Sequence, residues 1–144
     1  MILLDTNVLS EPMRPKPSPL VVAWLDAHFG VCALSSITVL ELEIGAQSLP
    51  AGRRRESLLG AVSLALDRFR PRILPFDDAA ARAAATLHVL ARSKGLPLSQ
   101  TPAKLADLQL AGIAAANECS LATRNAADFR GLGLDVIDPW SSTA

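Results

Sequence analysis

Short apolar runs that end in polar residues recur along the chain, and they constrain its fold more than any other feature. The first run covers residues 1–4 without a break and stops at Asp5, Thr6 and Asn7. This is the pattern of a strand that is buried on both faces and followed by a turn. Such strands are typical of a parallel sheet covered by helices. Further short strands are expected at residues 31–34, 73–75, 121–123 and 136–137.

Segments with helical periodicity separate the expected strands. Their approximate ranges are 20–28, 37–47, 56–68, 78–94 and 102–117. Side chains suited to cap their N-termini are Ser35 or Ser36, Asp77 or Asp78, and Thr101, which Pro102 follows. Strands that alternate with helices at this spacing predict a right-handed, mostly parallel α/β domain with three layers. No repeat or boundary divides residues 1–144, so we expect a single domain.

The charge balance argues against a strongly basic nucleic-acid binder. Fourteen Lys and Arg residues balance 14 Asp and Glu residues, which gives a formal net charge of zero. No global basic field therefore attracts the chain to nucleic acid or to a membrane, and any RNA binding has to be local, weak or helped by a metal ion. Six arginines offer either a phosphate track or a solvated helix face: Arg53, Arg54, Arg55, Arg68, Arg70 and Arg72.

The cysteines and the hydropathy pattern indicate the cellular compartment in which the protein is expected. Cys32 and Cys119 lie in apolar segments without a CxxC motif, which favours reduced, buried thiols. No apolar run reaches the roughly 18 residues needed to span a bilayer. Residues 1–5 also lack the basic start of a signal peptide. We therefore expect a soluble, cytoplasmic protein with no membrane partner.

Three aspartates stand where a carboxylate is expected to meet a ligand. Asp5 follows the first strand, and ligands bind at the carboxyl ends of open parallel sheets, although capping of the turn is the alternative. Asp107 lies in the expected second turn of an apolar helix, which favours a buried ligand. Asp128 follows the fourth strand; it could instead cap the turn into Phe129, which would leave Asn125 to reach the site.

Glu41 stands out because of its place on a helix. At helical spacing it shares one face with apolar Ile37, Leu40 and Ile44, so we expect its side chain to point toward the core. Glu43 points away from that face. A core-facing carboxylate needs a cation or hydrogen bonds to compensate its burial, and an arginine partner is the alternative to a metal.

Together these acids favour a hard metal ion. Clustered carboxylates repel one another, so an empty site is unfavourable and binds cations avidly. Oxygen ligands suit Mg²⁺ or Mn²⁺. His28 and His88 are isolated on helices and are expected to serve packing or the surface rather than a zinc site.

Four segments in order resemble the acidic motifs of the PIN-domain family, and closely those of its VapC toxin branch with the FitB-like members. They are LLDTNVLSE at 3–11, SITVLELEIG at 36–45, ADLQLA at 106–111 and TRNAADF at 123–129. Each motif alone is weak, but four in order at family spacing, over essentially the whole chain, form a specific signal.

The resemblance implies a three-layer fold with a central parallel sheet of about five strands flanked by helices. It implies an endoribonuclease that uses Mg²⁺, with Mn²⁺ able to substitute, and acts as the toxin of a toxin–antitoxin pair. Asp5 and Asp107 would be the principal metal ligands, and Glu41 and Asp128 would complete the catalytic acids. The polar residues expected to orient ligands or waters are Thr6, Asn7, Ser36, Thr123 and Asn125. The implied partners are an RNA substrate, a cognate antitoxin and a second copy of the chain.

Other readings fit the sequence less well. A haloacid dehalogenase-type phosphatase wants an acid two residues after the first aspartate, where this chain has Asn7. A receiver domain wants an acidic pair after the first strand and a late lysine, neither of which is found. The remaining alternative is a PIN-like scaffold that binds RNA or protein without cutting; such scaffolds usually lose acids, whereas all four are present here.

Overall fold

A parallel sheet forms the centre of the protein, as expected. The computed structural model describes residues 1–141, and within them five parallel strands form one sheet in the order β3-β2-β1-β4-β5. The strands are β1 (Ile2–Leu4), β2 (Cys32–Ser35), β3 (Ile73–Leu74), β4 (Ser120–Ala122) and β5 (Val136–Ile137). Leu3 lies opposite Ala33 on β2 and Leu121 on β4. This register brings the carboxyl ends of β1, β2 and β4 to the same edge.

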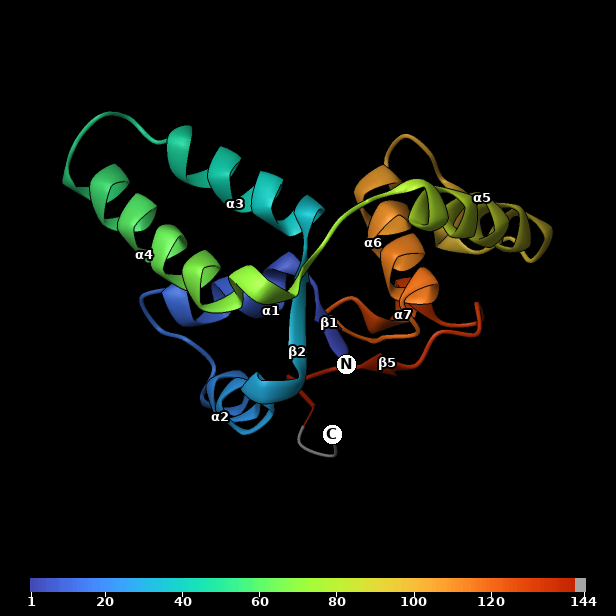
Figure 1. Ribbon diagram of the computed structural model, residues 1–144, viewed down its shortest axis with the longest axis horizontal. Coiled ribbons are helices and arrows are strands. Elements are labelled where there is room, and N and C mark those ends of the chain that lie inside the picture. The colour runs from blue at the N-terminus through green and yellow to red at the C-terminus, as the bar shows by residue number, and fades with distance from the viewer. Residues whose placement is uncertain (142–144) are drawn as a thin grey trace.

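Helices cover both faces of the sheet, which makes three layers (Figure 1). One group comprises α1 (Thr6–Ser10), α2 (Pro19–His28), α3 (Ser36–Gln47) and α4 (Arg53–Phe69). The other comprises α5 (Asp78–Ser93), α6 (Leu105–Ala116) and α7 (Ala126–Phe129). Leu3 and Leu121 pack with the α5–α6 group, whereas Leu4 and Ala122 pack with the α1–α4 group. Neighbouring strand residues thus enter opposite cores, and this explains why the runs are apolar without a break.

Short 3-10 helices complete several connections: η1 (Glu11–Met13), η2 (Phe29–Val31), η3 (Arg70–Arg72) and η4 (Pro97–Ser99). Cys32 and Cys119 are buried free thiols, as expected. Within residues 1–141, no helix combines the length and the apolar character that crossing a membrane requires.

A close helix contact holds α6 against α5. A Cβ placed on Gly112 would lie 2.5 Å from the carbonyl oxygen of Ala80 and 2.7 Å from the Cβ of Ala84. No side chain fits at this point, so the glycine lets the two helix backbones approach. The contact fixes the position of α6, which carries Asp107.

Two of the expected helix caps are present, and one is not. Ser35 Oγ accepts from Thr38 N at 3.0 Å at the start of α3, and Asp77 Oδ1 accepts from Ala80 N at 3.0 Å at the start of α5. The expected helix start at Thr101 and Pro102 is wrong, because residues 101–104 form turns and α6 begins at Leu105. The Thr101 hydroxyl lies 3.5 Å from His88 Nε2 and caps no helix.

Two other expectations about local structure need correction. The residues after Asp5 form the short helix α1 rather than a simple turn, because Asp5 caps it. The helix expected at 56–68 begins earlier, because Arg53, Arg54 and Arg55 form the start of α4.

The expected core face of α3 is also wrong. Leu40 and Ile44 are 56% and 55% exposed, and the buried positions of the helix are Thr38, Leu42 and Ala46. Apolar residues occur on more than one side of α3, so periodicity alone could not choose the face. Packing of α3 against α1 and α4 seats Leu42 and Ala46 instead.

Candidate active site

Asp5 lies at the centre of the sheet edge where β1, β2 and β4 end. Its side chain is only 7% exposed and accepts hydrogen bonds from Thr6 N at 2.7 Å and from Thr123 Oγ1 at 2.7 Å. Asn7 Nδ2 adds a longer contact of 3.4 Å. Asp5 therefore does cap the turn, but it also faces the other acids. Burial raises its pKa; the bonds from Thr123 and Thr6 lower it, and the charges of Asp107 and Glu41 raise it.

Glu41 reaches this edge from α3 through hydroxyl groups and not through the core. The Glu41 residue is exposed, and its Oε1 accepts from Thr6 Oγ1 at 2.8 Å. The Thr6 hydroxyl also lies 3.0 Å from Thr38 Oγ1. Because the single hydroxyl proton of Thr6 goes to Glu41, Thr38 has to be the donor to Thr6. The buried Ser35 donates to Thr38 Oγ1 at 3.4 Å, so a one-way chain of donors ends at the Glu41 carboxylate.

The expectation that the Glu41 side chain points toward the core is therefore wrong. Within residues 1–141 no arginine or lysine pairs with it, so the arginine alternative has no support either. Glu43 accepts from Gln47 Nε2 at 2.9 Å on its own helix. Thr38 was missed by sequence reasoning, although a threonine at the third position of a serine-capped helix is a usable signal.

Asp107 lies in the first turn of α6, one turn earlier than expected. Burial raises the pKa of its carboxyl, Lys104 lowers it, and the negative charges of Asp128 and Glu41 raise it further. Asp107 therefore interacts electrostatically with each of the other three acids, Asp5, Glu41 and Asp128. The positive end of α6 also favours a carboxylate in this first turn.

Asp128 is paired with a lysine. Its Oδ2 lies 3.1 Å from Lys104 Nζ, and this bond and the Asp128 charge raise the pKa of Lys104. Asn125 donates its backbone N–H to Thr123 Oγ1 at 3.1 Å, and no hydrogen bond of its side chain is found in residues 1–141. The charge of Asp128 acts on Asp107, which favours Asp128 over Asn125 as the fourth polar group.

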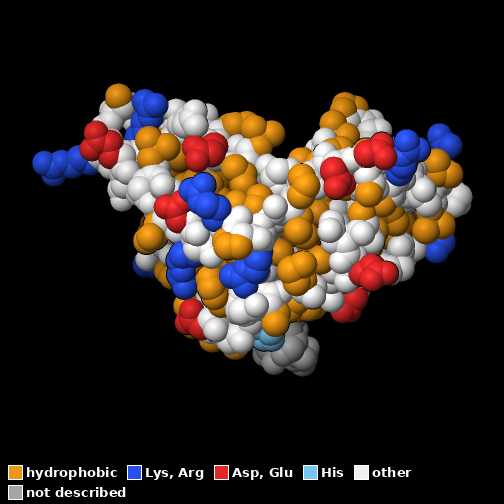
Figure 2. Space-filling model, in the orientation of Figure 1, with side chains coloured by type: hydrophobic (Ala, Val, Ile, Leu, Met, Phe, Trp, Pro, Cys, Tyr) orange, Lys and Arg blue, Asp and Glu red, His pale blue; other side chains and the backbone are white. Residues whose placement is uncertain are grey.

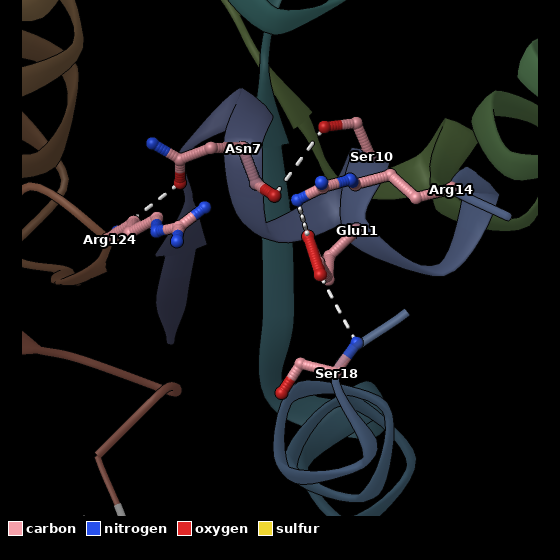
Figure 3. A network of polar contacts seen from close by, with 6 residues as sticks. All are labelled: Asn7, Ser10, Glu11, Arg14, Ser18 and Arg124. Atoms are coloured by element: carbon pink, nitrogen blue, oxygen red, sulfur yellow. Dashed lines mark hydrogen bonds and ion pairs between the residues drawn. The ribbon is translucent and has the colours of Figure 1, made fainter. Parts of the chain in front are cut away.

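Ser36 and Asn7 hold the surroundings of the site. Ser36 Oγ accepts from Phe76 N at 3.1 Å, which ties the end of β2 to the segment after β3. Asn7 Oδ1 accepts from Arg124 N at 3.3 Å, and Figure 3 shows these two residues facing each other. The ligand-orienting role that the resemblance implies for Ser36 stays a prediction.

A buried acid outside the site fixes the proline-rich segment after α1. Glu11 is 4% exposed and accepts from Arg14 Nη1 at 3.3 Å and from Ser18 N at 3.1 Å (Figure 3). Sequence reasoning did not single out Glu11. Its bonds are satisfied by its own segment, which indicates a structural role.

The arginines at the end of α4 are engaged with the protein. The guanidinium carbons of Arg68 and Arg72 lie 4.5 and 5.0 Å from the centroid of the Phe29 ring. Arg72 also donates to the carbonyl oxygens of Phe29 and Gly30, and Arg70 pairs with Asp67. These contacts favour local packing over a phosphate track for these three arginines.

The acids can bind a cation only if further ligands, such as water molecules, complete its coordination. Within residues 1–141, no three His, Cys, Asp or Glu side chains converge closely enough to hold an ion by themselves. The donor set is nonetheless all oxygen, and desolvation of Asp5 and Asp107 disfavours their charged forms without a cation. Mg²⁺ commonly keeps several waters and takes one or two carboxylates, which this arrangement provides.

A cavity of about 340 Å³ adjoins the acidic edge between α1, α3 and α4. Thr6 and Glu41 line it together with apolar Met13, Leu42 and Leu58. Figure 2 shows the surface hollowed between the half of the molecule that carries α3 and α4 and the half that carries α5 and α6. A ligand that enters the cavity beside Glu41 would also meet these apolar side chains.

A parallel α/β sheet with four acids at its carboxyl edge defines the class of this protein. The chain belongs to the PIN domain family, whose model matches residues 2–133. It is 41% identical to VapC ribonuclease Y4jK of Sinorhizobium fredii, with 97% of this chain and 98% of that protein covered. It is 38% identical to Toxin FitB of Neisseria gonorrhoeae, with 97% and 99% covered. The crystal structure of FitAcB from the same organism superposes with a TM-score of 0.87 at 39% identity, over 97% of this chain and 99% of that one.

Proposed function

We propose that this chain is an RNA-cleaving toxin of a toxin–antitoxin pair, and that residues 1–144 form one PIN domain that hydrolyses phosphodiester bonds. The observation that carries the proposal is that Thr6 at the carboxyl end of β1 donates to both Asp5 and Glu41, and that Asp107 acts on both of these carboxylates. The names of the relatives, a VapC ribonuclease and a toxin, support the same class.

Asp5 and Asp107 would hold Mg²⁺, and Mn²⁺ would substitute. A bound divalent ion lowers the pKa of a water molecule and neutralises charge that develops on the phosphate. Thr123 and Thr6 orient the Asp5 carboxylate, and the hydroxyl chain through Thr38 and Thr6 orients Glu41. The side-chain partners described for the four acids are Thr6, Asn7, Thr123 and Lys104, and a water molecule activated by the ion would be the attacking group.

The proposed partners follow from the surface. Unpaired RNA is the preferred substrate, because a small chain without net positive charge has little means to open a duplex. A cognate antitoxin would bind at the cavity beside Thr6 and Glu41, which offers apolar contacts next to negative charge. The exposed Leu40 and Ile44 on α3 support a homodimer. RNA as the substrate and two free thiols agree with the cytoplasm.

Cleavage assays test the proposal. Purified protein, free of any antitoxin, should cleave single-stranded or loop RNA in Mg²⁺ or Mn²⁺ and should be inactive in EDTA. The Asp107→Asn variant, purified in parallel, should be inactive. Cutting in EDTA, or equal cutting by the variant, would show contamination or a different mechanism. Binding of RNA without cutting would favour the scaffold alternative.

A further inference from the structure

A lysine stands beside the acids at a position that helix stability does not explain. Lys104 is the N-cap residue of α6 and makes no capping hydrogen bond with its side chain. Serine, threonine, aspartate and asparagine are favoured at this position, and a positive charge there is repelled by the positive end of the helix. Lys104 therefore costs the helix some stability, and this points to a role outside α6.

The geometry directs the Lys104 ammonium toward the acidic edge. Its Nζ lies 3.1 Å from Asp128 Oδ2, and the two side chains are 31% and 27% exposed. The backbone is fixed on both sides, because Lys104 N donates to Gln100 O at 2.7 Å and Leu108 N donates to Lys104 O at 2.9 Å. Lys104 also acts on Asp107, three residues along the helix.

The ammonium retains donors for a further ligand. An ammonium group has three N–H bonds, and within residues 1–141 Asp128 accepts the only hydrogen bond from Lys104 Nζ. The exposed fraction of the side chain leaves the remaining donors accessible from the solvent. An anionic group that enters the site can therefore bind Lys104 without displacing Asp128.

The charge of the site makes such a contact useful. Four carboxylates outweigh the two charges of one divalent ion, so the edge stays negative even with the ion bound. An RNA phosphate, itself negative, has to approach this edge. The Lys104 ammonium, which pairs with Asp128 and acts on Asp107, lowers the repulsion between this edge and the phosphate.

We propose that Lys104 contacts an RNA phosphate at the active site and that Asp128 is a positioning residue that holds Lys104 rather than a metal ligand. A partly exposed ion pair of this kind contributes little to stability, so what Asp128 provides is the orientation of the ammonium. The inference rests on the proposed function for its substrate class.

RNA binding without turnover tests the proposal. The full chain is titrated with a labelled single-stranded RNA in EDTA and again in Ca²⁺, over a range of salt concentrations. Lys104→Met should weaken binding about tenfold, as loss of one charge-assisted hydrogen bond would. It should also reduce the salt slope by about 0.7, the value for one phosphate contact on a single strand. Lys104→Arg should recover most of the affinity.

Two further variants separate position from charge. Lys16→Met removes the same charge from an exposed lysine and should leave affinity nearly unchanged. Asp128→Asn should weaken RNA binding less than Lys104→Met, and the double variant should show no further loss, because both changes disrupt one contact. The rise in melting temperature on adding Mn²⁺ should persist in Lys104→Met and in Asp128→Asn.

Each half of the proposal can be overturned. If Lys104→Met binds RNA with wild-type affinity, Lys104 only neutralises the acids. A larger rise in melting temperature with Mn²⁺ in this variant would show the same. Loss of the Mn²⁺ response in Asp128→Asn would make Asp128 a metal ligand. Wild-type protein that binds RNA through Lys104 but never cuts it would refute the nuclease and leave this inference standing. Cutting that is indifferent to Lys104→Met would refute this inference alone.

Discussion

The hydroxyl of Thr123 donates a 2.7 Å hydrogen bond to Asp5 Oδ2, although 118 positions separate the two residues in the chain. The bond joins the ends of β4 and β1, and Thr123 is fully buried there. It favours the ionised carboxylate and lowers the pKa of Asp5 against the effect of burial. This hydroxyl therefore partly offsets the effect of burial, which is the larger of the two and raises the pKa of Asp5.

Thr123→Val should destabilise the protein by about 1–3 kcal/mol, because it leaves a buried acceptor without its donor in a side chain of the same shape. The pKa of Asp5 should rise further. Denaturant unfolding measures the loss, with Thr123→Ser as the control that keeps the hydroxyl. Equal stability of the two variants would contradict the role assigned to this bond.

Divalent ions should stabilise the folded chain, because they bind the native acids and not the unfolded state. At a Mn²⁺ concentration about 100 times the dissociation constant, the gain is about 2.7 kcal/mol. Asp5→Asn and Asp107→Asn should lose most of the rise in melting temperature, whereas Asp135→Asn, whose carboxylate accepts from Ser120 Oγ, should keep it. An unchanged rise in melting temperature in the first two variants would contradict the proposed metal site.

Glu41→Gln should lower RNA cleavage about 10–100-fold, the cost typical of a disturbed partner of a metal site. Glu43→Gln is the matched control on the same helix, because Glu43 bonds to Gln47 and not to Thr6. The measurement is kcat/KM in Mg²⁺. Equal losses in the two variants would show that the hydroxyl chain does not single out Glu41.

Asp107→Asn should stabilise the metal-free protein at neutral pH. Burial and the neighbouring acids raise the pKa of Asp107 above its ordinary 3.8, so the folded state binds this proton more tightly than the unfolded chain. The resulting stabilisation is complete below about pH 3.8 and is lost as the pH rises through the folded-state pKa. At pH 7 the ionised carboxylate therefore opposes folding.

Melting temperatures in EDTA check this prediction. The variant should melt a few degrees higher than wild type at pH 7, and the difference should shrink toward pH 4. A variant that melts lower at pH 7 would show that the favourable interaction of Asp107 with the positive end of α6 outweighs its burial.

The sequence by itself determined the sheet and the place of two of the four acids. Apolar runs such as residues 1–4 have room only between two layers of helices, and a chain that alternates strands and helices forms parallel strands whose carboxyl ends share one edge. Asp5 and Asp128 follow two of these strands, so sequence order was enough to bring them to that edge. Their motifs also indicated the family before any contact was known.

Only the tertiary structure decided which way several side chains point. The apolar residues on α3 offered two faces, and contact with α1 and α4 chose the one with Leu42, leaving Glu41 exposed and bonded to Thr6. The start of α6 and the pairing of Lys104 with Asp128 depend on a turn that local sequence signals placed wrongly. Periodicity and capping preferences act over a few residues. The partners of these side chains come from segments more than 20 positions away, and only packing brings them together.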